Sequence, residues 1–194
     1  MRGCFMLFTN TATFDIIALS SITTKEGHKM KVLVLNGSPK GQNSVTLQYA
    51  KYLEKISTQN CLDNGFDFDY INVGKNVYSY SNADKLQEVL DKISEADMLV
   101  VAYPVYTFLA PSQLHRFFEI LDSNRVKLTD KYVVQVTTSK RFYDVTAHQA
   151  VKDMVCHLEG KYVDGYSADM DDLLNDGLRA HFKNWWDYVL YRVN

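Results

Sequence analysis

Cysteine is scarce in this chain, and its three copies lie far apart. Cys4, Cys61 and Cys156 form no CxxC pair among the 194 residues. An odd number of widely spaced cysteines argues against a disulfide framework, a zinc ribbon and a cysteine-ligated iron–sulfur cluster. The histidines form no H-E-x-x-H or similar pair, so we predict no metal site. Free thiols are typical of a reducing compartment, which predicts a cytoplasmic protein.

The chain also lacks an excess of either charge and any long apolar run. Its 21 lysines and arginines are balanced by 23 aspartates and glutamates, for a net charge of -2. This balance disfavours nucleic acid as the main partner, because such proteins carry a basic surface. No apolar run reaches the roughly 18 residues that span a bilayer, so we predict no membrane partner. A hydrophobic content of 46% is normal for a globular domain.

The first 29 residues differ in pattern from the rest. Apolar patches at 4–8 and 14–19 are separated by a polar segment that contains three threonines and one asparagine. A signal peptide would need a basic start and an unbroken apolar stretch, so this pattern fits it poorly. We expect residues 1–29 to be an N-terminal extension outside the fold, with a signal peptide as the alternative, and residues 30–194 to form one domain.

From Met30 onward, segments typical of strands and of helices alternate. Short apolar or alternating segments predict strands at 31–35, 66–73, 98–102, 132–136 and 161–167. Apolar residues at helical spacing predict helices at 45–56, 86–93, 114–121, 147–158 and 178–189. This alternation favours a parallel sheet with helices on both faces. We predict an α/β fold with three layers, in which a doubly wound sheet of five parallel strands has the order 2-1-3-4-5.

The loop that follows the first strand has the composition of an anion site. In a doubly wound sheet, ligands bind at the carboxyl ends of the strands where the winding reverses, here between strands 1 and 3. The loop enters a helix, whose first amide groups and dipole favour an anion. Its hydroxyl, amide and ammonium groups belong to Ser38, Lys40, Asn43, Ser44 and Thr46. We predict a phosphate cup; the alternative is that these side chains only cap the helix.

The loops after the third and fourth strands complete the pattern. The segment 103–111 carries Tyr103, Tyr106 and Phe108, which could stack on a ring system. The alternative role for these aromatics is core packing or a subunit interface. The segment 137–144 offers hydroxyls for the polar edge of a heterocycle. A phosphate cup beside an aromatic platform fits flavin mononucleotide (FMN).

Two motifs are similar to those of a known family. Residues 37–44 resemble a G-S-P-[RK]…N-[ST] phosphate loop, and residues 104–117 resemble a P-V-Y…Q-L-K-x-F flavin loop and helix. On these motifs, residues 30–194 resemble the flavodoxin-like superfamily of NAD(P)H-dependent FMN reductases and quinone reductases. The resemblance implies a flavodoxin-like fold and an FMN-binding domain over residues 30–194.

The resemblance also implies a set of cofactor contacts. The residues implied to hold the FMN phosphate are Ser38, Lys40, Asn43, Ser44, Val45 and Thr46. Those implied to line the isoalloxazine ring are Pro104, Val105, Tyr106, Thr107 and Phe108. Thr138 and Ser139 would meet the ring from the third loop. Members of the family are usually dimers with the flavin near the subunit boundary, so we expect a homodimer.

The predicted function is that of an FMN-dependent oxidoreductase. Hydride would pass from NAD(P)H to bound FMN, and electrons would then pass to a small acceptor such as a quinone or a flavin. The cofactor supplies this chemistry, so we name no catalytic residue. The alternative is a flavodoxin-type electron carrier that does not oxidise NAD(P)H.

Two further groups of residues have open roles. His148, near the third loop, either contributes to the site or packs in its helix. Asp169, Asp171 and Asp172 are interpreted as capping residues for the last helix.

Overall fold

The computed structural model describes residues 29–60, 65–139 and 143–193. Its elements in chain order are β1 (Met30–Asn36), η2 (Gly41–Asn43), α1 (Val45–Asn60), β2 (Phe66–Ile71), α2 (Val73–Asn76), η3 (Val77–Ser81), α3 (Ala83–Glu95), β3 (Met98–Pro104), α4 (Ser112–Ser123), β4 (Tyr132–Thr138), α5 (Val145–His157), β5 (Lys161–Ala168), η5 (Asp172–Leu174) and α6 (Asp176–Val193). Each predicted strand and helix is present. The predicted extension, apart from Lys29, lies outside the described residues.

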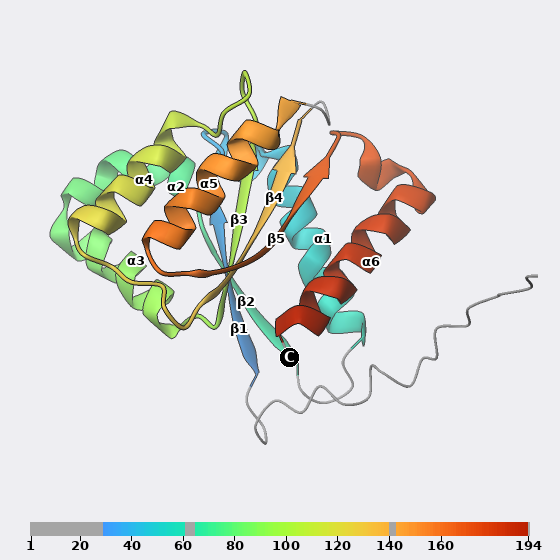
Figure 1. Cartoon of the computed structure of the whole chain (residues 1–194), viewed down its shortest axis with the longest axis horizontal. Coiled ribbons are helices and arrows are strands. Elements are labelled where there is room, and N and C mark those ends of the chain that lie inside the picture. Colours follow the sequence, from blue (N-terminus) through green and yellow to red (C-terminus); the bar gives the residue numbers. More distant parts are fainter. Residues whose placement is uncertain (1–28, 61–64, 140–142, 194) are drawn as a thin grey trace, which may run out of the picture.

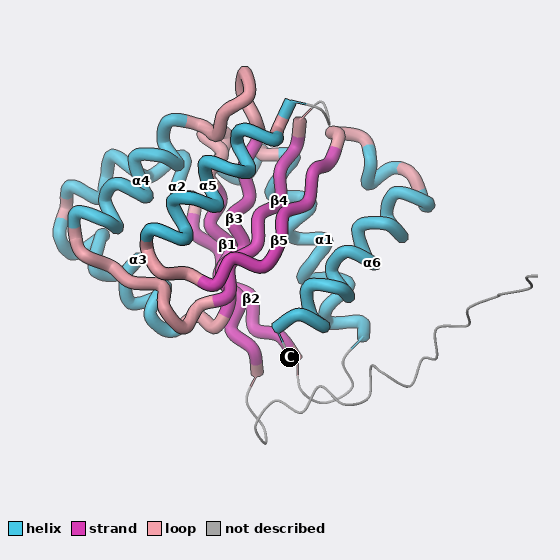
Figure 2. The backbone as a smooth tube through the Cα atoms, in the orientation of Figure 1, coloured by secondary structure: helices cyan, strands magenta, loops and turns pink. Residues whose placement is uncertain are grey.

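The strands form one parallel sheet in the order β2-β1-β3-β4-β5, which confirms the predicted α/β fold. Figure 2 shows the sheet between two groups of helices. The register pairs Asn36 with Ala102, Pro104 with Thr138, and Thr138 with Ala168. The carboxyl ends of four strands therefore lie along one edge.

The helices divide between the two faces of the sheet. Helices α2 to α5 cover one face, and α1 and α6 cover the other (Figure 1). Successive side chains of β1 point to opposite faces of the sheet, so both faces need cover. Leu33 packs into the core on one face and Val34 into the core on the other. Trp186 of α6 is fully buried and donates from Nε1 to Ser57 Oγ at 2.8 Å. Among the described residues, no helix combines the length and apolarity needed to span a bilayer.

The second strand is shorter than the sequence predicts. We expected it to continue to Val73, but β2 ends at Ile71, and Val73 begins the short helix α2. The reason is tertiary, because Gly74 packs against the backbone of residues 37 and 38. This contact places α2 directly behind the loop that follows β1.

Candidate functional site

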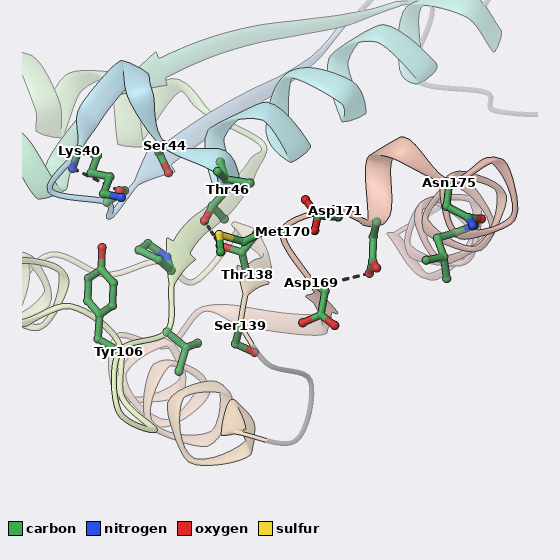
Figure 3. Close-up of a pocket in the computed structure, with 16 residues that line it drawn as sticks. Lys40, Ser44, Thr46, Tyr106, Thr138, Ser139, Asp169, Met170, Asp171 and Asn175 are labelled. Atoms are coloured by element: carbon green, nitrogen blue, oxygen red, sulfur yellow. Dashed lines mark hydrogen bonds between the residues drawn. The ribbon is translucent and has the colours of Figure 1, made fainter.

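A cavity of about 560 Å³ opens at the carboxyl edge of the sheet, a size typical of small-molecule sites. Four connections contribute to it: those after β1, β3, β4 and β5 (Figure 3). The lining residues are Ser38, Lys40, Ser44, Val45, Thr46, Pro104, Val105, Tyr106, Thr138, Ser139, Asp169, Met170, Asp171, Asp172, Asn175 and Leu178.

The first wall is the N-terminus of α1 and the loop before it. Gly41 adopts a φ of 55°, a conformation that a residue with a side chain rarely accepts. Ser44 is buried, and its Oγ accepts the N–H of Leu47 at 3.4 Å, as a helix cap does. The first backbone N–H groups of α1 have no acceptor within the helix. Since Ser44, Val45 and Thr46 line the cavity, this wall can donate hydrogen bonds to an anion.

The second wall joins α1 to the ends of β3 and β4. Thr46 Oγ1 and Thr138 Oγ1 lie 2.6 Å apart, so one hydroxyl donates to the other (Figure 3). Both side chains are buried, and their bond holds the helix N-terminus against the end of β4. Pro104 and Val105 extend this wall, and Tyr106 stands half-exposed at its end. The wall therefore offers an apolar surface next to paired hydroxyls.

The third wall is the connection from β5 to α6. Asp172 is buried, and its Oδ2 accepts the N–H of Asp169 at 3.0 Å. The Tyr49 hydroxyl donates to the carbonyl of Asp169 at 2.5 Å, and burial raises the pKa of Tyr49 to about 12. Asn175 caps α6, since its Oδ1 accepts the N–H of Leu178 at 3.1 Å. The aspartates were interpreted as helix caps, but Asn175 does this, and Asp172 fixes the loop instead.

The charges are distributed unevenly along the cavity. Lys40 lies at the end formed by the β1–α1 loop, and Asp169 and Asp171 lie toward the opposite end (Figure 3). The positive end of the α1 dipole adds to the field of Lys40. An elongated ligand would therefore place its anionic group at the α1 end.

The structure brings most of the predicted site residues to this cavity. Asn43, Thr107 and Phe108 are the exceptions; Asn43 is exposed in η2. Thr107 and Phe108 line an adjacent hollow of about 350 Å³ with Val105, Ser139 and Tyr143. These two residues, with φ values of 49° and 71°, form the tip of a tight turn. Backbone hydrogen bonds between Tyr106 and Leu109 close the turn.

Sequence reasoning missed the wall after β5. The sequence-based prediction places the site on the connections after β1, β3 and β4 and gives the acidic residues a role in capping the last helix and stabilising its dipole. The available signal was their position directly after β5, since all parallel strands end at the same edge. It also missed the side chain of Asn36 and the role of Gly74, which depend on contacts with residues about 36 positions away.

His148 belongs to α5, one of the helices on the face of the sheet that α2 to α5 cover. Its Nε2 lies 2.8 Å from Thr137 Oγ1, and Gly165 leaves room for the ring, since a Cβ there would be 2.7 Å from Nδ1. Burial lowers the pKa of His148, although the carboxylates of Asp144 and Asp164 act in the opposite direction. Nε2 is also 3.7 Å from Asp144 Oδ2, but burial dominates and favours the neutral ring.

This burial predicts a pH dependence of stability. Between about pH 6.5 and the lower pKa of the folded state, the unfolded chain binds a proton that the folded His148 does not. The free energy of unfolding should therefore fall as the pH drops through this window. Urea unfolding at about pH 7.5 and 5.5 measures this. From the higher to the lower pH, the free energy of unfolding should fall less in His148→Gln than in the wild type. Equal falls in both proteins would contradict the assignment.

The family model described as NADPH-dependent FMN reductase matches residues 30–171. A search of curated proteins found no match. Among solved structures, an NADH:FMN oxidoreductase in its apo form aligns with 86% of this chain and 91% of its own, with a TM-score of 0.70 and 21% identity.

Two other solved structures align over similar lengths. An FMN-dependent NADH-azoreductase from Bacillus anthracis, in complex with FMN, has a TM-score of 0.52 and 18% identity, covering 84% of this chain and 97% of its own. An NAD(P)H:quinone oxidoreductase from Methanothermobacter marburgensis has a TM-score of 0.57 and 14% identity, covering 85% and 95%. At these identities the structures support the fold.

Proposed function

Because the chain belongs to the NADPH-dependent FMN reductase family, whose model matches residues 30–171, we propose that its cavity binds FMN and that the protein passes electrons from NAD(P)H to a small acceptor. The family membership confirms the predicted class, an FMN-dependent oxidoreductase. We further propose that residues 30–194 are the FMN-binding domain, and that the site residues act as described below.

The donor set at the α1 end of the cavity suits a phosphate monoester. It combines backbone N–H groups of the first helical turn, the buried hydroxyls of Ser38, Ser44 and Thr46, and the ammonium group of Lys40. The single observation that carries the proposal is that this anion site shares one cavity with the platform at 104–106. A cofactor with a phosphate at one end and a flat ring at the other would contact both.

The remaining residues would orient the ring. Pro104, Val105 and Tyr106 would lie against it, and Thr138 and Ser139 would meet its polar edge. Thr107 and Phe108 would approach it from the adjacent hollow. When bound, FMN supplies the redox chemistry, because a flavin takes a hydride from a reduced nicotinamide and gives electrons to an acceptor. The protein's part is to bind and orient, and no residue is required to move a proton in the hydride step.

Anaerobic titration tests this proposal against the electron-carrier alternative. Purified protein loaded with FMN should lose its absorbance near 450 nm on addition of NADPH or NADH and regain it on addition of a quinone. A flavin that stays oxidised with both nicotinamides but is reduced by dithionite would favour a carrier. Failure to bind added FMN would contradict the proposed site itself.

A homodimer and a cytoplasmic location complete the proposed function. Phe108, Leu109 and Tyr143 are exposed, two of them in the hollow beside the cavity, and a second copy could cover them. Sedimentation velocity on the wild type and on Leu109→Ser tests this. The wild type should sediment as a dimer and the variant should dissociate more readily, whereas a monomeric wild type would exclude it.

A further inference from the structure

The side chain of Asn36 lies at the centre of the loop that forms the cavity's anion end. It is fully buried at the last position of β1. Its Nδ2 donates to the carbonyl of Gly41 at 2.9 Å and to Oδ1 of Asn72 at 2.9 Å. Its Oδ1 accepts the N–H of Ser38 at 3.2 Å. One amide group thus connects both ends of the segment 38–41 with the start of α2.

The orientation of this amide is fixed by its partners. The carbonyl of Gly41 can only accept a hydrogen bond, and the N–H of Ser38 can only donate one. Nδ2 must therefore face Gly41 and Oδ1 must face Ser38. Both N–H donors of the Asn36 amide are then in use, the second of them on Asn72. A replacement that lacks the acceptor takes away the partner of the buried Ser38 N–H, and one that lacks the donor leaves the carbonyl of Gly41 with only the N–H of Ser44.

The other hydrogen bonds at these two positions are local to the loop, since the carbonyl of Gly41 also accepts the N–H of Ser44 at 3.1 Å. The segment turns at Gly41, which has a φ of 55°. The backbone N–H of Gly41 donates to the carbonyl of Ser38 at 3.1 Å. The side chain of Asn36 is hydrogen-bonded to both ends of this turn and joins it to β1, a strand of the sheet. Its hydrogen bonds reach Ser38, Gly41 and Asn72 and none of the residues in the platform at 104–106.

We propose that Asn36 is the positioning residue that makes this site selective for a phosphorylated flavin, FMN, over the same flavin without its phosphate, riboflavin. The inference rests on the proposed function, because it assumes that the phosphate lies in the 38–46 loop. Asn36 holds Ser38 and Gly41 at the separation that the loop needs to surround an anion. Asn72, at the start of α2, supports this by accepting a hydrogen bond from the second N–H of the Asn36 amide.

Binding of FMN and riboflavin to the apoprotein tests this inference. The wild type should prefer FMN, and Asn36→Ala should weaken FMN binding at least about tenfold while the Kd for riboflavin changes less than about threefold. Asn72→Ala removes one of the three bonds and should give an intermediate loss of preference. Asn72→Gln keeps a neutral amide acceptor for Asn36 Nδ2 and should retain more of the wild-type preference than Asn72→Ala. Calorimetry supplies both constants without any turnover.

The outcomes separate the inference from the proposed function. If the wild type binds both flavins equally, the phosphate site itself is wrong. If the wild type prefers FMN and both Asn36→Ala and Asn72→Ala keep that preference, the loop does not depend on Asn36 and the inference fails. An equal loss for both flavins would also overturn it, because it would indicate general damage to the fold. Should Asn36→Ala fail to fold, the two Asn72 variants decide by their difference.

Discussion

Replacing Gly74 with alanine is expected to destabilise the protein and to weaken FMN binding, although the residue lies outside the cavity. A Cβ at this position would be 2.5 Å from the carbonyl carbons of Gly37 and Ser38. Backbone atoms cannot rotate away as a side chain can, so either α2 or the 37–44 loop must move. We expect a loss of about 2–3 kcal/mol in the free energy of unfolding, the upper range for overpacked sites. We also expect the Kd for FMN to rise at least about tenfold.

Gly65→Ala is the matched control for this substitution. A Cβ at Gly65 would have no atom within 4 Å, and its backbone φ is not positive. The two variants share the loss of a glycine but differ in the space around it. Urea unfolding and fluorescence titration with FMN should therefore separate them clearly. If Gly74→Ala behaves like Gly65→Ala in both measurements, the close approach of α2 to the loop is not what shapes the site.

Replacing Ser44 with aspartate should reduce FMN affinity by about 100-fold while leaving the helix capped. Ser44 lines the anion end of the cavity, and its Oγ accepts the N–H of Leu47. Aspartate is also a favourable N-cap, and its charge suits the helix dipole. The same charge opposes a bound phosphate by about 2–3 kcal/mol at a separation near 5 Å in a partly screened site. Affinity and stability should therefore respond differently to one substitution.

Ser44→Asn isolates the charge from the change in size. Asparagine has nearly the volume of aspartate and caps helices equally well, but it is neutral. The Kd for FMN of the aspartate variant should exceed that of the asparagine variant by at least about tenfold. Added salt should narrow the gap, because ions screen the repulsion. Equal affinities of the two variants would place the phosphate elsewhere.

The local pattern of the sequence is enough to predict the elements and their order. The strand predicted from Lys31 and the helix predicted from Val45 are both present in the structure. Each could be predicted because the pattern of apolar residues is a property of the segment alone. The same reasoning brings Ser44 and Tyr106 to one edge of the sheet, since parallel strands must end together.

Other features depend on residues that meet only after folding. Valine is common in strands, yet Val73 begins α2, because Gly74 packs against the loop after β1. The bond from Asn36 to Asn72 joins positions 36 residues apart, and no local pattern encodes it.

The amino-acid order alone therefore specifies five strand–helix units, the parallel sheet and the loop with the composition of an anion site. Packing between distant segments decides how that loop is held and which wall the β5–α6 connection adds. It also decides that His148 packs against Thr137 and Gly165 and is not among the residues that line the cavity. The physical reason is that periodicity and helix-end chemistry act within one turn or one strand. Close contacts such as those of Gly74 and Asn36 exist only once the layers have come together.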